Sequence, residues 1–525
     1  MRGGELGGIT VSRLVAYVPG ILMRPSSWEP LLTKLLAEPE WKTGTRILPH
    51  DHGGHLWSRK RAHTLAFNLA AAIHTDWQVN GAVDEVVLLG HSMGALLVRQ
   101  AYLNGLHKER EWARHVTRIV LLSGINRGVE LRQELRALLP FLLPGEGLVK
   151  DVLSGSDFVT NLRISWIKTL ASMPRRPVVV QVRGGQDRLV HEDDSIDVEG
   201  FLEGHQLLAT GANHADLVLP DRKGEFSDEK YSVLRYAALR EIPNDPSNKR
   251  IENDQQKIFF VVHGIRDSNN DWVTAISRSI EGSIPGAEVV PPTFGRFSAL
   301  QFVMPLARRM KVRWFQDLYS MKLARNPLAK FYFVGHSYGT FLLGHALQNL
   351  SGLEFERVVL AGSVLPETLR WGDFSGRVKQ LRNYRAQKDT PVAILCKALR
   401  GVGLGGGIGT AGYTGFSIPF ALESECFYYA GGHDATVVSE QAQRDIVGFL
   451  EQGYSYSPQS AMVKEDANFT RLSAAAPVLA YVLLLICALV SLAITWLVPS
   501  LPLWRVAAIV LGVLAGVLFV FLAFY

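Results

Sequence analysis

The sequence predicts an α/β protein with two tandem domains, each built on a doubly wound and mainly parallel sheet, followed by two C-terminal transmembrane helices. Three observations lead to this prediction. The chain has 525 residues, which is more than one hydrophobic core usually organises. Short runs rich in Val, Ile and Leu alternate with helical patterns, as expected of parallel strands covered by helices on both faces. The residues from 474 to 525 are almost free of charge.

The second half of the chain repeats the first. The segment RLVAYVPGI ends an apolar strand in a turn at Gly20, and IFFVVHGI does the same at Gly264. The motif GHSMG around Ser92 returns as GHSYG around Ser337. The serines are 245 positions apart (337 − 92) and the glycines 244 (264 − 20), so a whole domain is duplicated. In chain order, the predicted parts are domain 1 at 1–243, a linker at 244–256, domain 2 at 257–455, a linker at 456–472 and a membrane hairpin at 473–525.

Ser92 is the predicted nucleophile of the first domain. In VVLLGHSMGALLV it lies between an apolar strand and a helix, and the flanking glycines allow the sharp turn that exposes a serine hydroxyl. Such a serine needs a histidine to take its proton and an acid to orient that histidine. Asp187 follows the strand in RPVVVQVRGGQDRLV, and His214 follows the strand in LLATGANHADL. The other acids in this part of the chain are Asp193 and Asp194, which lie farther out in a charged loop, and Asp216, which is too close to His214.

The second domain carries a corresponding set. Ser337 lies in FYFVGHSYGTFLLG, Asp389 follows the strand in VKQLRNYRAQKDTPVAIL, and His433 follows the strand in CFYYAGGHDATV. The stretch between acid and histidine includes a Gly-rich loop at 401–416. That loop lacks the lysine of a phosphate-binding P-loop and the register of a dinucleotide site. We interpret it either as a loop beside the pocket that gates it or as a surface insertion.

Main-chain N–H groups must stabilise the negative oxygen of the tetrahedral intermediate. The residue after each serine supplies one donor, and the residue after the first turn of each domain supplies the other. The predicted donors are Met93 and Ile21 in the first domain, and Tyr338 and Ile265 in the second.

These motifs resemble the α/β-hydrolase superfamily, in particular its lipase- and esterase-like branch, over about 13–240 and 257–450. That superfamily has the chain order Ser, Asp, His found in both domains. GINRG at 124–128 and LPHDHGG at 48–54 are similar to segments that follow strands in lipases, and the His-Gly pair in VVHGI fits as well. Pro19, where lipases often have histidine, departs from the pattern, as does Ile-Asn in place of Thr-Pro within GINRG.

The resemblance implies an acyl-enzyme mechanism, with serine as nucleophile, histidine as base and then acid, and aspartate as the orienting group. It also implies a lid over the first site. The stretch at about 129–172 is a surplus between Ser92 and Asp187 and contains two apolar, helix-capable segments. A helical decoration without a lid function is the alternative.

The sequence gives little support for a metal site, a disulfide framework or a nucleic-acid-binding surface. The histidines of HDHGGH at 50–55 lack a matching set of carboxylates or cysteines, so we interpret them as pocket lining and not as a metal site. The three cysteines show neither zinc nor disulfide spacing. The net charge of +6 is dispersed, and its densest clusters, SRKRAH at 58–63 and RRM at 308–310, are interpreted as solvated helix faces. The sequence therefore predicts no metal, no organic cofactor and no nucleic-acid partner.

The two C-terminal runs, about 474–498 and 503–525, are each long enough to cross a bilayer, for which about 20 apolar residues suffice. A buried helical hairpin is the alternative. No signal peptide is recognisable at the start of the chain, so we expect the catalytic domains on the cytoplasmic side, as in a protein of a bacterial inner membrane. Gly512 and Gly516 form a small-xxx-small pair, which favours a homo-oligomer through the hairpin.

The sequence thus predicts a membrane-anchored serine hydrolase that cleaves carboxylic esters, with lipid esters as the expected substrates because the anchor holds the sites near the bilayer. The same residues are compatible with an acyltransferase or a thioesterase. They are also compatible with one catalytic domain joined to one regulatory or binding domain in a membrane assembly.

Overall fold

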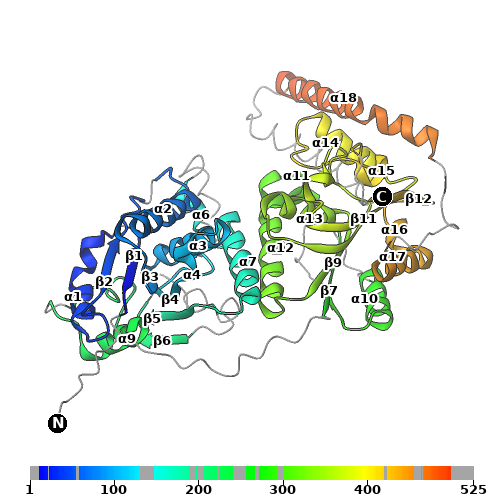
Figure 1. Cartoon of the computed structure of the whole chain (residues 1–525). Coiled ribbons are helices and arrows are strands. Elements are labelled where there is room, and N and C mark those ends of the chain that lie inside the picture. Colours follow the sequence, from blue (N-terminus) through cyan, green and yellow to red (C-terminus); the bar gives the residue numbers. More distant parts are fainter. Residues whose placement is uncertain are drawn as a thin grey trace, which may run out of the picture. The chain divides into compact units, whose positions relative to one another are not determined.

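A computed structural model gives the fold of the chain (Figure 1). It describes residues 11–21, 23–54, 58–129, 147–187, 197, 205–221, 224–239, 256–265, 271–291, 299–418, 423–453, 463 and 465–497. These residues fall into two compact units. The first is drawn from Met1–Glu252 with Asp317–Leu328, and the second from Asn253–Gln316 with Ala329–Tyr525. The boundaries predicted for the two domains and their linkers remain predictions.

The first unit is built on a six-stranded sheet with the order β2-β1-β3-β4-β5-β6, in which every neighbouring pair is parallel. Its strands are β1 (Arg13–Val18), β2 (Thr45–Pro49), β3 (Glu85–His91), β4 (Val116–Leu122), β5 (Val178–Gly184) and β6 (His205–Ala209). Its helices are η1 (Pro25–Trp28), α1 (Glu29–Ala37), α2 (Ala62–Asn80), α3 (Met93–His107), α4 (Glu111–Arg114), α6 (Leu148–Asp151), α7 (Asp157–Ser172) and α9 (Asp228–Leu239).

Both faces of this sheet are buried. Along β1, Leu14, Ala16 and Val18 belong to one hydrophobic cluster, which α2, α3 and α7 complete. The alternate residues Val15 and Tyr17 belong to a second cluster, which α1 and α9 complete. Because successive side chains of a strand point to opposite faces, this division means that helices cover the sheet on both sides. The predicted α/β class with a mainly parallel sheet is confirmed.

Part of the predicted lid is a helix of the core. Helix α7 places Val159, Leu162 and Trp166 in the same buried cluster as α3. Helix α7 lies between β4 and β5 in the chain and is a crossover helix packed in the core, whereas a lid would cover the active site. The stretch 130–146 of the predicted insertion lies outside the described residues.

The second unit has the sheet order β12-β11-β10-β9-β7-β8, again with parallel pairs throughout. Read from β8, the order corresponds strand by strand to that of the first unit. Its strands are β7 (Lys257–Val262), β8 (Ala287–Val290), β9 (Lys330–His336), β10 (Phe355–Ala361), β11 (Val378–Ala386) and β12 (Glu423–Tyr429). Its helices are α10 (Asp271–Ser283), α11 (Ala299–Val303), α12 (Pro305–Arg325, in this unit up to Gln316), α13 (Tyr338–Asn349), η2 (Trp371–Phe374), η3 (Pro391–Cys396), α14 (Lys397–Gly401), α15 (Ala411–Thr414), α16 (Ala435–Val438) and α17 (Glu440–Gln452).

Helices also cover both faces of the second sheet. On β7, Phe259 and Val261 join a buried cluster with α10 and α17. The intervening Phe260 points to the other face, where its ring meets Phe315 of α12 edge-on. The repeat read from the sequence therefore corresponds to two units with the same strand order and the same double covering.

The Gly-rich stretch 401–416 is packed against the second unit. Ile408, Ala411 and Tyr413 are buried. At Gly412 a side chain would overlap the backbone of Ser363, so only glycine allows this close approach. A surface insertion, one of the two interpretations from the sequence, does not describe this packing.

Helix α18 (Ala467–Leu497) begins inside the predicted linker 456–472. Its start has a local cause at Asp466. The Oδ1 atom of that residue accepts the N–H groups of Asn468 (3.0 Å) and Phe469 (3.1 Å), as a helix-capping aspartate does. The sequence interpretation missed this cap because it placed the boundary by hydrophobicity alone.

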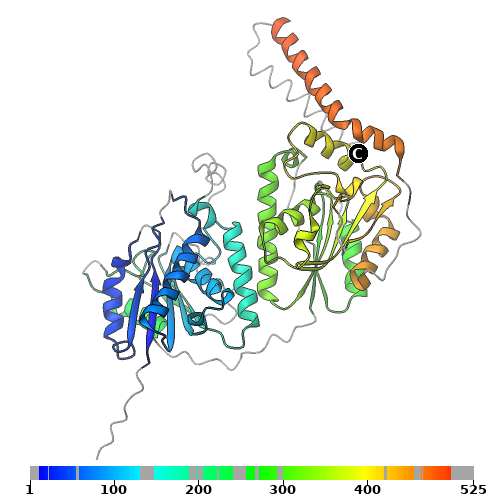
Figure 2. The same cartoon turned by 45° about the horizontal axis from the view of Figure 1, so that its top comes forward.

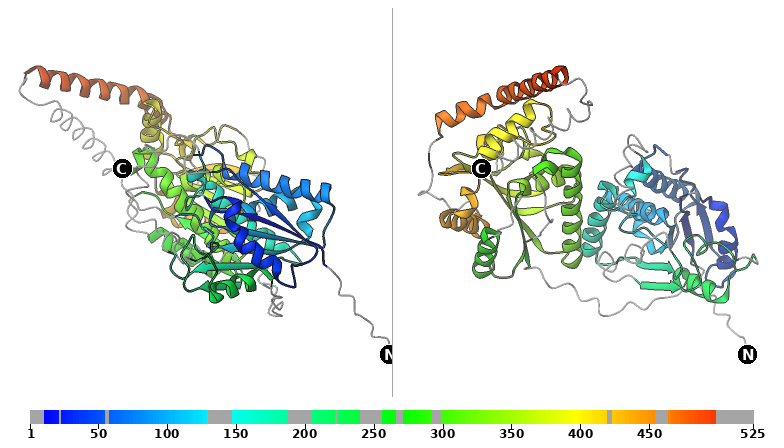
Figure 3. Two further views of the ribbon diagram at one scale, coloured as in Figure 1. Left: turned by 90° about the vertical axis from the view of Figure 1, so that its left-hand side faces the viewer. Right: turned by 180° about the vertical axis from the view of Figure 1, so that it is seen from behind.

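The first half of α18 lies along η3 and α14, the helices that follow Asp389 (Figures 2 and 3). The buried Ser473 hydroxyl donates to the Ala393 carbonyl (2.7 Å), and the Tyr481 hydroxyl donates to the Gly401 carbonyl (2.6 Å). The helix is therefore part of the second unit along this half.

Within α18, the stretch Ala467–Val490 is long and apolar enough to cross a membrane, with a mean hydropathy of 2.4. Of its most apolar window, 12% is buried inside the protein. Length and composition are the grounds for this assignment, and a helix of a soluble core can meet them too. It is the one candidate span in the described part of the chain, and the second predicted span, 503–525, lies outside the described residues.

Candidate active sites

Both predicted nucleophiles lie on a sharp turn between a strand and a helix. Ser92 joins β3 to α3, and Ser337 joins β9 to α13. Both have φ 53° and ψ −119°, a conformation that L-residues rarely adopt. Such strain persists only where the surroundings enforce it, and here each serine N–H is held by the neighbouring strand. The acceptors are the carbonyls of Leu122 and Ala361, both at 2.9 Å.

Two glycines of the first turns lie directly against these serines. A Cβ on Gly20 would lie 3.0 Å from the Cβ of Ser92 and 2.8 Å from Nδ1 of His91. A Cβ on Gly264 would lie 2.8 Å from the Cβ of Ser337. These distances are too short for any side chain, so glycine is required at both turns. The equivalence of the two glycines predicted from the sequence therefore has a steric basis.

In the first unit, the structure pairs His214 with Asp187. The Nδ1–H group of His214 donates to Oδ2 of Asp187 at 2.8 Å. The carboxylate is fully buried, while the imidazole is 12% exposed. Because a carboxylate can only accept, this bond fixes the tautomer with the proton on Nδ1 and leaves Nε2 as the basic nitrogen. Of the other acids considered, Asp193 and Asp194 lie outside the described residues.

The second unit repeats the pairing. The Nδ1–H group of His433 lies 2.9 and 3.0 Å from the two carboxylate oxygens of Asp389. Asp389 is fully buried, and its Oδ1 also accepts the N–H of Val392 (3.0 Å) at the start of η3. The carboxylate is therefore anchored to the helix that follows it as well as to the imidazole.

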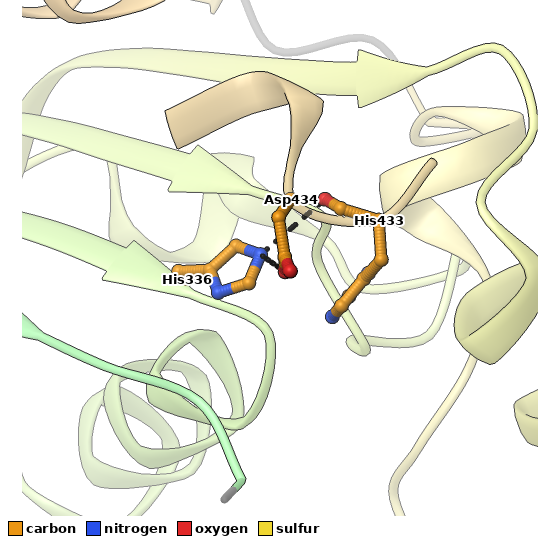
Figure 4. Close-up of side chains that lie close together, drawn as sticks. All are labelled: His336, His433 and Asp434. Atoms are coloured by element: carbon orange, nitrogen blue, oxygen red, sulfur yellow. Dashed lines mark hydrogen bonds and ion pairs between the residues drawn. The ribbon is translucent and has the colours of Figure 1, made fainter. Parts of the chain in front are cut away.

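A second histidine in each site was missed by the sequence interpretation. His91 precedes Ser92, and its Nε2–H donates to the carbonyl of His214 at 2.8 Å. His336 precedes Ser337, and its Nε2–H donates to the carbonyl of His433 at 3.4 Å (Figure 4). The sequence feature that could have pointed to these two residues is the histidine that GHSMG and GHSYG share.

The hydrogen bond from the histidine that precedes each serine joins the serine turn to the loop of the paired histidine. The ring centroids of His91 and His214 are 5.1 Å apart, and those of His336 and His433 are 4.6 Å apart. Burial, together with the nearby His214 imidazole, lowers the pKa of His91 to about 4. His91 is therefore neutral at physiological pH and acts as a hydrogen-bond donor, not as a second base.

The predicted site residues of each unit lie at one edge of its sheet, because the carboxyl ends of parallel strands meet there. Ser92, Asp187 and His214 follow β3, β5 and β6, and the second set follows β9, β11 and β12. Met93 and Tyr338 are the first residues of α3 and α13, so their N–H groups have no acceptor within the helix. Ile21 and Ile265 follow the glycines that touch the serines. These positions suit the predicted oxyanion donors, whose role stays a prediction.

The second site also contains a candidate metal-binding group. Ligand atoms of His336, His433 and Asp434 lie within 4.8 Å of one another, and Figure 4 shows the three side chains together. An ion there would occupy the imidazole that the hydrolase chemistry needs as a base. Asp434 is 68% exposed and lies 3.5 Å from Nε2 of His336. An exposed acid of this kind is common without a metal.

The histidines of HDHGG show no such grouping in the described residues, and His55 lies outside them. Burial lowers the pKa of both His50 and His52. Nδ1 of His52 accepts the N–H of Gly54 at 2.9 Å. His52 is buried and His50 half-buried, and their role as pocket lining stays a prediction.

Comparisons with known proteins give structural neighbours only. No protein-family model matches the sequence, and no curated protein matches it. Phospholipase PlaB from Legionella pneumophila is 17% identical with a TM-score of 0.26, over 34% of this chain and 39% of PlaB. A lipase-esterase related protein from Clostridium acetobutylicum is 18% identical with a TM-score of 0.27, over 40% of this chain and 91% of that one. A monoacylglycerol lipase from Paleococcus ferrophilus is 13% identical with a TM-score of 0.30, over 42% and 92%.

These three solved neighbours are a phospholipase, a lipase-esterase related protein and a monoacylglycerol lipase. The aligned part is about two fifths of PlaB's length. At these identities and scores the likeness says nothing about the substrate of this chain, and the chemistry must be argued from its own residues.

Proposed function

We propose that this chain is a membrane-anchored serine hydrolase with two active sites, which cleaves carboxylic esters through an acyl-enzyme. One observation carries the proposal. In both units a serine in the same strained conformation lies at the sheet edge where a histidine is bonded to a fully buried aspartate. Strained backbone costs free energy, as does a buried carboxylate, and finding both twice in the same arrangement favours function over packing.

The reaction follows from these groups. The serine oxygen attacks the ester carbonyl carbon while Nε2 of the histidine takes the hydroxyl proton, and the carbonyl oxygen becomes negative. The N–H groups of Met93 and Ile21, or of Tyr338 and Ile265, stabilise that oxygen. Collapse of the intermediate expels the alcohol, which receives the proton from the imidazolium.

Water then attacks the acyl-enzyme by the same route in reverse. The histidine takes a proton from the water and returns it to the serine oxygen as the carboxylic acid leaves. The buried aspartate keeps its charge throughout and stabilises the imidazolium.

We propose lipid esters as the substrates. The part of α18 beyond its contact with the second unit exposes large apolar side chains. Among them are Leu485, Leu489, Leu492 and Trp496, with exposed fractions of 56–79%. A lipid surface would cover them, and the second site would then act close to the bilayer. We further propose that both units lie on the cytoplasmic side of the membrane.

The test is lipid analysis of cells that express the wild type, Ser92→Ala, Ser337→Ala or the double variant at equal levels. The proposal expects depletion of particular ester lipids, with release of their acids, in the wild type and none in the double variant. Each single variant then assigns substrates to one site. Equal lipid profiles for the wild type and the double variant would count against lipid esters as substrates.

A further inference from the structure

A buried arginine beside the second site has no acidic partner in the part of the chain that the structure describes. Arg308 of α12 is fully buried, and its Nη2 donates to the carbonyls of Leu404 (3.4 Å) and Gly406 (3.2 Å). Its Nε and Nη1 atoms have no hydrogen-bond partner. Three N–H donors of the guanidinium are therefore unused.

This arrangement corrects the interpretation of RRM at 308–310 as a solvated helix face. Arg309 and Met310 are exposed, but Arg308 is not. An arginine that serves only as packing buries its aliphatic stem and keeps its charged end in water. Here the charged end is buried too, and an isolated buried charge is costly unless something pairs with it.

The surroundings of the guanidinium compensate for part of that cost. Its Cζ lies 5.6 Å from the ring centre of Phe302 and 5.6 Å from that of Phe341, so it makes two cation–π contacts. Burial nevertheless holds the pKa of Arg308 below its ordinary value. The guanidinium therefore combines aromatic contacts with unused donors, the two kinds of interaction that an anion carrying an apolar chain would use.

Arg308 adjoins the residues that form the second site. The hydroxyl of Tyr338 donates to the main-chain carbonyl of Arg308 at 2.9 Å, and Tyr338 directly follows Ser337. The Tyr338 ring also packs against the same two phenylalanines, edge-on with Phe302 and stacked on Phe341. One tyrosine side chain therefore connects the arginine to the proposed nucleophile.

The acid of the triad is also within electrostatic reach. The pKa of the buried Cys396 thiol is raised mainly by burial and further by the Asp389 carboxylate, while the Arg308 guanidinium lowers it. Arg308 and Asp389 therefore both lie within electrostatic range of the Cys396 thiol.

The Gly-rich loop supplies the two carbonyls that now hold Nη2. Gly403 and Gly407 have φ values of 78° and 84°, which glycine adopts without strain. His345 donates from Nε2 to the Gly407 carbonyl at 3.2 Å, and main-chain N–H groups farther along the loop donate to the carbonyls of Val364 and Ser363, both at 2.7 Å. A neutral backbone carbonyl is a weaker partner for a guanidinium than an oxyanion is.

We propose that Arg308 is the anion-binding residue of the second active site and takes a phosphate or carboxylate group carried by the ester substrate. The guanidinium offers its unused donors to the anionic oxygens, and Phe302 and Phe341 flank the adjoining carbon chain. The proposal rests on the proposed function of the second unit and adds the substrate class, an ester with a negative charge. The first unit has its own buried cation, Arg99, which donates to the carbonyls of Ala95 and Asn126.

The test measures the hydrolysis of three esters that share the same acyl chain. The enzyme is the full-length Ser92→Ala protein, in which only the second site reacts. The esters are a neutral monoacylglycerol, a lysophosphatidic acid and an acyl glycolate. The quantity compared is the value of kcat/KM for an anionic ester divided by the value for the neutral ester. In Arg308→Met this ratio falls at least about tenfold, because a charge-assisted hydrogen bond to the substrate is lost. The fall comes from a higher KM for the anionic ester. A fall for the lysophosphatidic acid identifies phosphate as the group that Arg308 binds, and a fall for the acyl glycolate identifies carboxylate.

Arg309→Met is the matched control, because it removes the same charge from the neighbouring, exposed position. It leaves the ratio unchanged. Arg308→Lys keeps the charge and retains part of the preference, and labelling of Ser337 by a neutral fluorophosphonate reports that each variant is folded. An unchanged ratio in Arg308→Met, or an equal fall in Arg309→Met, overturns the proposal.

A binding experiment separates this proposal from the proposed function. If the second site hydrolyses none of the three esters, the hydrolase assignment of that site fails. Calorimetric titration of the full-length double serine variant with glycerol 3-phosphate and with glycolate then tests the anion site alone. Binding of either anion that Arg308→Met abolishes and Arg309→Met retains supports the site, and no binding of either anion overturns it.

Discussion

Replacing Asp389 by asparagine tests the most specific contact of the second site. The variant keeps the shape of the side chain but removes its charge. His433 Nδ1 lies 2.9 and 3.0 Å from the two carboxylate oxygens, which places the centres of charge about 4 Å apart once the imidazole is protonated. At an effective dielectric constant of about 20, that attraction amounts to about 4 kcal/mol. Its loss from the transition state slows the reaction roughly a thousandfold.

The assay is the rate at which a fluorophosphonate labels Ser337 in the Ser92→Ala protein. Asp434→Asn is the control, because it also removes a carboxylate, from the residue that follows His433 in the chain. The Asp434 side chain is 68% exposed and lies 3.5 Å from Nε2 of His336. The control slows labelling by no more than about fivefold, since exposed ion pairs contribute at most about 1 kcal/mol. The reasoning is refuted if Asp389→Asn labels within fivefold of its parent. It is also refuted if both variants slow equally, a result that would favour the candidate metal group.

Three further predictions concern the framework of the sites. His91 has a folded-state pKa of about 4 against an ordinary 6.5, so its stabilising effect is complete above pH 6.5 and is lost as the pH falls towards 4. That loss amounts to about 3 kcal/mol, and His91→Gln should flatten the dependence of the urea midpoint on pH over this interval. Gly264→Ala should abolish labelling of the second serine, whereas Gly282→Ala, whose Cβ would meet nothing within 4 Å, should leave the rate unchanged. Ser473→Ala should lower the unfolding free energy of the second unit by about 1 kcal/mol, measured by urea titration, because the Ala393 carbonyl loses its donor.

The fold and the candidate triads could be predicted from sequence because they depend on local patterns. Apolar strands alternating with helices indicate a parallel sheet, and the carboxyl ends of parallel strands meet at one edge. Asp187 and His214 each follow a strand, so their sequence positions brought them to the same edge as Ser92. The choice of Asp187 over Asp216 was made on spacing, and the 2.8 Å bond to His214 agrees with it.

Contacts between distant segments were beyond the sequence. The motif GHSMG does not predict that His91 makes a hydrogen bond to the carbonyl of His214, which lies 123 residues away. The burial of Arg308 depends on a loop nearly a hundred positions later that covers it. The docking of α18 likewise depends on single hydrogen bonds such as that of Ser473. Composition predicted the apolar character of α18 but not the partners of these residues.

The central claim is that both units hold a working serine nucleophile. The most direct measurement is the labelling stoichiometry of the full-length protein with a fluorophosphonate, read by intact-protein mass spectrometry. The account predicts two labels per chain in the wild type, one in Ser92→Ala, one in Ser337→Ala and none when both serines are replaced. A wild type that takes up a single label, or labelling that survives in the double variant, would contradict it.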